Sequence, residues 1–198
     1  TILSTYSIQV QNNKTAQESM TDEQLMQAVK EGELAKASEL FDRYNKHLYN
    51  FFVKISFDRE AGHDLTQNVF LRMIKFKHTY KPEAKFKSWI FQIARNVYAD
   101  HYRSNKIIKS DYTEVEDIGQ KVEAIDEQIV KNEKEKLLYV ALYKLSLEQR
   151  EVLLLSKFQK MKYEEIAQVY NTTESAIKVR VHRAMSKLKD QYLQLEKI

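Results

Sequence analysis

The sequence has no cysteine, a single proline and only three glycines in 198 residues. Without cysteine the chain can form no disulfide, no thiolate metal site and no cysteine nucleophile. Glycine and proline build the tight turns that join antiparallel strands, so their scarcity argues against an all-β fold. We therefore expect a mostly helical protein.

Long apolar runs are also missing. The longest are short stretches such as residues 152–155, far below the ~18 residues that indicate a membrane span. Residues 1–20 are polar and lack the basic start and apolar core of a signal peptide. The sequence predicts a cytoplasmic protein that does not insert into a membrane.

Charge is distributed unevenly, although the formal net charge is only +4. Residues 72–109 carry ten basic and two acidic side chains, and residues 157–189 carry eight and three. Between them, residues 111–135 carry nine acidic and three basic side chains. Such an acidic segment with few large apolar residues does not bury enough surface to fold alone. We interpret residues 105–133 as a flexible acidic linker.

Before this linker, helical periodicity predicts a compact domain over residues 21–104, preceded by a poorly ordered extension over residues 1–20. The first helix of this domain begins with a capping box of Thr21 and Gln24 and ends near Gly32. Three further helices are predicted over residues 34–55, 60–75 and 86–103. Their apolar faces must pack together to leave water, which makes this part a helical bundle.

A second helical domain is predicted over residues 134–192. Its helices cover residues 137–145, a stretch from the capping box of Ser146 and Gln149 to about Lys157, and residues 163–170 and 174–195. Asn171 can take the left-handed conformation that a tight turn needs. A short helix, a turn and a longer basic helix form a helix-turn-helix pattern, whose second helix can enter the DNA major groove.

Five segments resemble one known family. Residues 163–167 (YEEIA) and 176–184 (AIKVRVHRA) are similar to region 4 of bacterial sigma factors of the extracytoplasmic-function (ECF) class, and residues 145–152 (LSLEQREV) to its start. Residues 61–70 (AGHDLTQNVF) resemble the polymerase-binding helix of region 2, and residues 87–96 (KSWIFQIARN) its promoter-melting segment. Because the segments follow the family's order, the chain is identified as a member of this class of the sigma-70 family.

The resemblance implies an all-α fold of two small domains, region 2 over residues 21–104 and region 4 over residues 134–192. It implies a transcription initiation factor that binds core RNA polymerase and directs it to promoters by recognising the minus-10 and minus-35 elements. An anti-sigma factor is the further partner that it implies. We expect no enzymatic activity, no cofactor, no metal and no small-molecule substrate.

The resemblance also implies site residues. Those expected to dock on core polymerase lie on the outward face of the helix over residues 60–75 and are Asp64, Gln67, Asn68 and Leu71. Those expected at minus-10 DNA are Lys77, Lys81, Lys85, Lys87, Arg95, Asn96 and Arg103. Those expected at the minus-35 duplex are Thr173, Glu174, Ser175, Lys178, Val179, Arg180, Arg183 and Lys187.

Other functions have less support from the residues. A helix-turn-helix regulator that works without polymerase would have no use for the residue 61–70 helix, and it would need a dimer and a palindromic site. An all-helical adaptor that binds only protein would carry the basic helix as ordinary surface. An enzyme ranks last, because the five histidines show no metal-ligand spacing and no nucleophile–base pair accompanies them.

Overall fold

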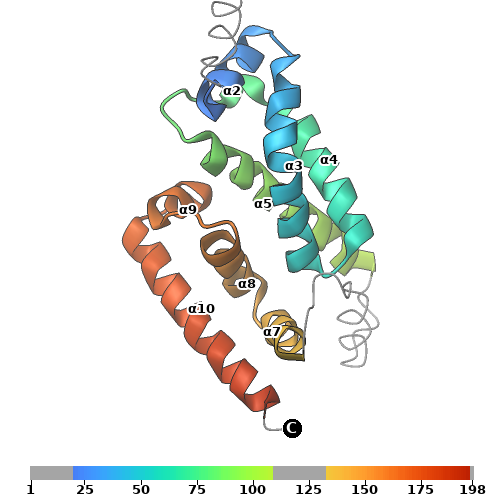
Figure 1. Ribbon diagram of the computed structural model, residues 1–198, viewed down its shortest axis with the longest axis vertical. Coiled ribbons are helices and arrows are strands. Elements are labelled where there is room, and N and C mark those ends of the chain that lie inside the picture. The colour runs from blue at the N-terminus through green and yellow to red at the C-terminus, as the bar shows by residue number, and fades with distance from the viewer. Residues whose placement is uncertain (1–19, 109–132, 197–198) are drawn as a thin grey trace, which may run out of the picture.

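The computed structural model describes residues 20–108 and 133–196, and within these ranges the chain forms helices and turns without a strand (Figure 1). The N-terminal block contains α2 (Asp22–Glu31), α3 (Lys36–Ser56), α4 (Arg59–Lys75), the short 3₁₀ turn η1 (Lys77–Thr79) and α5 (Phe86–Ile108). The C-terminal block contains α7 (Glu133–Tyr143), α8 (Leu147–Leu153), the π-helical turn η2 (Leu154–Phe158), α9 (Tyr163–Tyr170) and α10 (Glu174–Leu195). This confirms the predicted all-α fold and the order of its helices.

The ends of the helices follow the predicted local signals. Thr21 and Gln24 cap α2 reciprocally, and Ser146 and Gln149 cap α8 in the same way. Each pair satisfies backbone N–H groups that have no partner within the helix. Gly32 ends α2 at a φ of 120°, a conformation that favours glycine.

Helices α3 and α4 cross closely, and this crossing sets the position of α4. A Cβ atom at Gly62 would lie 2.7 Å from Cγ2 of Val53, so only glycine lets the two helices approach this far. Asp58 caps α4 by accepting a hydrogen bond from the N–H of Ala61 at 2.9 Å. Leu65, Val69 and Met73 are buried against α3, which turns the opposite face of α4 outward.

Four helices build the C-terminal block, and the last two are joined by a tight turn. Asn171 adopts the left-handed conformation there, with φ 48° and ψ 55°, as the sequence predicts. Thr173 then caps α10 by accepting a hydrogen bond from the N–H of Ala176 at 3.2 Å. Ile177 and Val181 are buried against the block.

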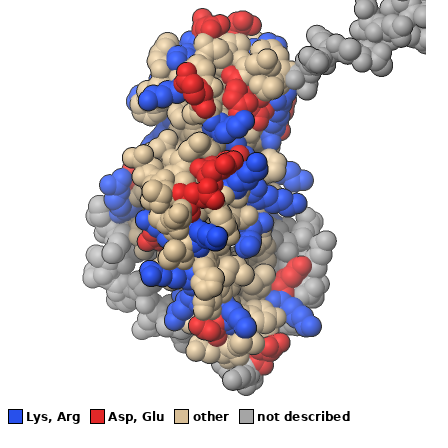
Figure 2. Space-filling model, turned by 90° about the vertical axis from the view of Figure 1, so that its left-hand side faces the viewer, with Lys and Arg blue, Asp and Glu red and all other residues tan. Residues whose placement is uncertain are grey.

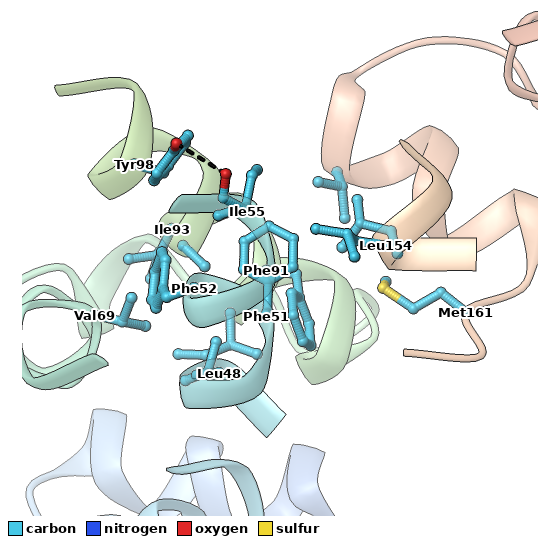
Figure 3. Close-up of a cluster of buried hydrophobic side chains, with 14 of the residues drawn as sticks. Leu48, Phe51, Phe52, Ile55, Val69, Phe91, Ile93, Tyr98, Leu154 and Met161 are labelled. Carbon is cyan, nitrogen blue, oxygen red and sulfur yellow. Dashed lines mark hydrogen bonds between the residues drawn. The ribbon is translucent and has the colours of Figure 1, made fainter. Parts of the chain in front are cut away.

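The two blocks pack against each other and share one continuous core. α5 contacts α9, and α3 contacts both α8 and η2. In Figure 3, Leu154 and Met161 project from the C-terminal block toward Phe51 and Phe91 of the N-terminal block. The apolar periodicity of single helices predicts each block but not this contact, because it does not show which extra apolar side chains face a second partner.

The boundaries of the predicted parts differ slightly from those of the helices. α5 continues to Ile108 and α7 begins at Glu133, so helix occupies both edges of the predicted linker. The rest of that linker and the predicted N-terminal extension, apart from Met20, lie outside the described residues. Among the helices that the structure does describe, none combines the length and apolar character needed to cross a bilayer.

Candidate functional site

The helix-turn-helix presents one face of α10 outward. The side chains at the start of this face are exposed, and they are Thr173, Glu174, Ser175, Lys178 and Val179. Val179 is 48 % exposed although it is apolar, so the face offers both polar groups and a methyl-bearing side chain. Base edges in a major groove are read by these two kinds of contact.

Three further basic residues predicted for this face lie along the same helix. Arg183 and Lys187 are exposed to solvent. Arg180 instead folds back onto its own block, where its Nη1 lies 2.9 Å from Oε1 of Glu148 and its guanidinium lies over the ring of Tyr170 at 5.4 Å. Arg180 therefore already contacts Glu148 and Tyr170, whereas Arg183 and Lys187 extend into water.

Basic side chains on this side of the molecule do not form one continuous patch. Figure 2 shows the face that carries α9 and α10, and Lys and Arg side chains are spread along it with acidic side chains among them. Contacts with DNA would therefore depend on individual side chains and their order along α10, more than on a uniform positive field.

The outward face of α4 carries the residues predicted to dock on a partner protein. Asp64, Gln67, Asn68 and Leu71 are all exposed, and Leu71 is 71 % exposed. Sequence reasoning missed two aromatic side chains nearby in the fold. Phe41 of α3 packs on Phe70 with ring centroids 4.8 Å apart and stays partly exposed. Phe76, at the end of α4, is exposed as well.

An ion network connects α4 with α5. Asp100 accepts hydrogen bonds from Nη1 of Arg72 at 2.7 Å and from Nη2 of Arg103 at 2.5 Å. The hydrogen bond from Arg72 is the main reason why the pKa of Asp100 lies below its ordinary value. Nε of Arg72 also donates to Oδ1 of Asn68 at 3.0 Å, so the network runs from the outward face of α4 to the exposed Arg103.

The residues predicted for minus-10 DNA fall into two groups. Lys81, Lys85, Asn96 and Arg103 are exposed. The other three are half-buried and each hydrogen-bonds within the molecule: Nζ of Lys77 donates to the carbonyl of Val29 at 3.1 Å, Nζ of Lys87 to the carbonyl of Gln159 at 2.7 Å, and Nε of Arg95 to Oε2 of Glu151 at 3.1 Å. Thus Lys87 and Arg95 bind the other block of the chain.

The aromatic residues near this region mostly pack. Tyr80 is fully buried, donates its hydroxyl to the carbonyl of Ala84 at 2.9 Å, and meets Trp89 edge to face at 5.2 Å. These contacts anchor the loop that carries Lys81 and Lys85. Tyr102, farther along α5, is the aromatic side chain of this helix that remains exposed.

Glu151 is the principal site residue that sequence reasoning missed. It is only 5 % exposed, and its Oε2 accepts hydrogen bonds from Arg95 and from the hydroxyl of Tyr170, the latter at 2.6 Å. Burial raises the pKa of Glu151, although both hydrogen bonds act in the opposite direction. The guanidinium of Arg95 also covers the ring of Tyr170 at 4.4 Å.

Metal ligands do not gather in the described ranges 20–108 and 133–196, where no three His, Asp or Glu side chains are placed to hold an ion together.

Family models match both blocks. The model described as Sigma-70 region 2 matches residues 40–107, and that described as Sigma-70, region 4 matches residues 135–188. The ECF RNA polymerase sigma factor SigX of Bacillus subtilis is 28 % identical over 155 residues, 76 % of this chain and 80 % of that protein. EcfG of Rhodopseudomonas palustris, also an ECF RNA polymerase sigma factor, is 30 % identical over 142 residues, 70 % of this chain and 75 % of that protein.

Solved structures share the fold. CnrH, in complex with the cytosolic domain of CnrY, superposes with a TM-score of 0.65 at 21 % identity, over 85 % of this chain and 95 % of that one. The sigma factor RpoE of Bartonella quintana, in complex with the anti-sigma factor NepR, gives a TM-score of 0.60 at 20 % identity, over 78 % of this chain and 94 % of that one.

Proposed function

This chain belongs to the ECF sigma factors of the sigma-70 family. We propose which of its exposed surfaces bind core RNA polymerase and which bind promoter DNA during transcription initiation. Such a factor binds core RNA polymerase and directs it to promoters through their minus-10 and minus-35 elements. Neither alternative left open by the sequence, a regulator that works without polymerase or a helical adaptor, accounts for a matched sigma region 2.

The minus-35 duplex is assigned to the outward face of α10. The observation that carries this assignment is the helix-turn-helix geometry, in which Ile177 and Val181 are buried while the start of the helix is exposed. We assign the contacts with base edges to the first residues of this face, which are Thr173, Glu174, Ser175, Lys178, Val179 and Arg180. Arg183 and Lys187 lie farther along the helix, where phosphates are the nearer partners.

The minus-10 element is assigned to α5 and to the loop before it. Single-stranded DNA needs cations for its phosphates, and the exposed side chains Lys81, Lys85 and Arg103 supply them. Asn96 is exposed on the same helix and can hydrogen-bond to a base. Lys77, Lys87 and Arg95 belong to the same proposed surface once their present contacts are released.

Core polymerase is assigned to the outward face of α4, with Asp64, Gln67, Asn68 and Leu71 at its centre. The support is the combination of polar side chains with a leucine that is 71 % exposed. Apolar side chains amid polar ones are typical of protein interfaces.

The domain limits and the remaining partners are parts of the same proposal. Region 2 covers residues 21–104 and region 4 covers residues 134–192, joined by a flexible tether over residues 105–133 and preceded by an N-terminal extension. An anti-sigma factor is proposed as a further partner, because RpoE of Bartonella quintana was solved with one. The chain acts in the cytoplasm, alongside RNA polymerase, and catalyses no reaction itself.

Assembly with core polymerase followed by run-off transcription tests this function. Purified chain and core polymerase should together initiate from a promoter at which core polymerase alone is silent.

The double variant Asp64→Ala/Gln67→Ala should bind core polymerase at least about tenfold more weakly, as the loss of two interfacial polar side chains predicts, while its helical circular dichroism stays unchanged. A matched control is Lys189→Ala, an exposed residue of α10 outside every proposed surface. Equal polymerase affinity of the double variant and this control would disprove the α4 assignment.

A further inference from the structure

The loop between η1 and α5 carries two exposed lysines, Lys81 and Lys85, that the proposed function assigns to the minus-10 strand. The N–H of Ala84 donates to the carbonyl of Lys81 at 2.9 Å and closes a four-residue turn. Pro82 is the second residue of this turn, a position that favours proline. The hydroxyl of Tyr80 donates to the carbonyl of Ala84 at 2.9 Å. The loop therefore has a defined shape, and this shape sets where its two lysine side chains begin.

Both ends of this loop are hydrogen-bonded to α2 (Figure 1). At the first end, Nζ of Lys30 donates to the carbonyl of Tyr80 at 2.7 Å. At the other end, Oε1 of Glu23 accepts a hydrogen bond from the N–H of Phe86, the first residue of α5, at 3.2 Å. An N–H group in the first turn of a helix has no partner within the helix, and a carboxylate is favoured there. α2 thus connects the two ends of the loop.

α2 is itself fixed to the helical bundle. Its side chains Leu25 and Val29 are fully buried in the core. At its start, Asp22 accepts hydrogen bonds from Nη1 of Arg43 at 2.6 Å and from the hydroxyl of Tyr44 at 2.5 Å, both on α3. The hydrogen bonds from α2 to the loop therefore come from a helix that is held in place on α3.

The family match assigns no role to this helix. The match to Sigma-70 region 2 begins at residue 40, and α2 ends at Glu31. The proposed function likewise places no polymerase or DNA contact on α2. Lys30 and Glu23 are half-buried, and the charged end of each lies on a backbone atom of the loop or of the first residue after it.

We propose that Lys30 and Glu23 are positioning residues for the minus-10 strand: they hold the loop in the shape in which Lys81 and Lys85 bind the phosphates of single-stranded DNA. This inference rests on the proposed function, because that function assigns the two loop lysines to the strand. A loop that α2 has already ordered does not have to be ordered by the DNA, so less of the binding free energy is lost.

The chain contains its own probe of the loop. Trp89 is the single tryptophan, and its ring lies 5.2 Å from that of Tyr80 and 6.2 Å from that of Phe86, the residues at the two ends of the loop. Lys30→Met removes the ammonium group and keeps an unbranched side chain, and Glu23→Ala removes the carboxylate. In the full chain, both variants should shift the tryptophan emission to longer wavelength and increase its quenching by acrylamide, while circular dichroism stays unchanged.

Strand binding is measured with the holoenzyme formed from each variant and core polymerase. The probe is a fluorescent single-stranded oligonucleotide selected from a random pool by the parent holoenzyme, followed by anisotropy at fixed salt. Both variants should bind it about three- to tenfold more weakly, the cost of ordering one long side chain on binding. The controls Lys46→Met on α3 and Glu31→Ala on α2 change exposed charges outside every proposed surface. These controls should match the parent in fluorescence and in strand binding.

A variant cycle separates positioning from a direct DNA contact. In a chain that carries Lys81→Ala and Lys85→Ala, Lys30→Met should cause no further loss of strand binding, because no loop lysine remains to be positioned. Lys30→Arg, which keeps a donor and a charge, should restore the parent values. An equal further loss in that background would show that Lys30 contacts the strand itself and would overturn the proposal.

Unchanged tryptophan fluorescence in both Lys30→Met and Glu23→Ala would show that α2 does not hold the loop. A changed signal with parental strand binding would show that holding the loop does not serve DNA. Either result overturns the proposal. A parent chain that forms no transcribing holoenzyme would instead defeat the proposed function, and the fluorescence of Trp89 would still show whether α2 holds the loop.

Discussion

At the residue scale, the side chains of α10 differ in what they are free to do. Arg180 is paired with Glu148, whereas Arg183 extends into solvent. A base contact by Arg180 therefore has to replace an ion pair, while a phosphate contact by Arg183 adds to an exposed charge. Substitution of Arg180 and substitution of Arg183 are therefore expected to change DNA binding in different ways.

We predict that Arg180→Ala weakens binding of the preferred minus-35 duplex by about 1–3 kcal/mol and relaxes its sequence preference. Arg183→Ala should weaken all duplexes alike and reduce the slope of log affinity against log salt by about 1. Both variants are measured in the holoenzyme, against a duplex selected from a random pool and a scrambled duplex. A uniform loss for Arg180→Ala, with no change of preference, would place Arg180 on a phosphate.

Exposure of single residues was largely predictable, whereas their partners were not. The spacing of Asp64, Gln67 and Leu71 opposite an apolar stripe is enough to turn them outward, and the structure confirms this exposure. Glu151 has no such signal, because an acidic residue within a helix is ordinarily solvated. Its burial arises only when Arg95 and Tyr170 arrive from helices distant in the sequence.

At the scale of elements, the α3–α4 crossing determines where the proposed polymerase surface lies. Gly62 allows this crossing, since a Cβ there would meet Val53 at 2.7 Å and Tyr49 at 3.2 Å. Both neighbours belong to α3, so any larger side chain must push α4 away.

We predict that Gly62→Val destabilises the fold by about 1–3 kcal/mol through overpacking. The measurement is the free energy of unfolding in urea, followed by circular dichroism. Val53→Ala should partly rescue Gly62→Val, because it removes the methyl groups that the new side chain meets. Strictly additive effects of the two substitutions would contradict this explanation.

Helix positions were predictable because their signals are local. Capping boxes, the breaks at Gly32 and Asn171, and apolar periodicity all act within a few residues, and each has its counterpart in the structure. The π-helical turn of η2 had no such signal. This turn joins α8 to the segment that carries Gln159 and Met161, and that segment packs against the other block.

At the scale of the whole molecule, the predicted picture of two separate domains is incomplete. Each block has the predicted helices, yet Phe51, Phe91, Leu154 and Met161 join their cores. If the segment between the blocks is the flexible tether proposed above, their packing depends on the affinity of the blocks and on their effective concentration, which is in the millimolar range when such a tether is short. The affinity of the two blocks for each other therefore determines whether they stay packed together in the free chain.

This affinity can be measured after cutting the chain between the blocks. We predict that, with a specific protease site inserted between residues 109 and 132, the two fragments remain associated after cleavage and elute as one particle at micromolar concentration. A micromolar Kd would correspond to about a thousandfold preference for closure in the intact chain. Met161→Ala should weaken the association by about 2 kcal/mol, the low end for such a truncation in a core. Val69→Ala, a buried truncation on α4 within the N-terminal block, serves as the control. Fragments that separate even near 1 mM would show that the two blocks are apart most of the time in the uncut chain.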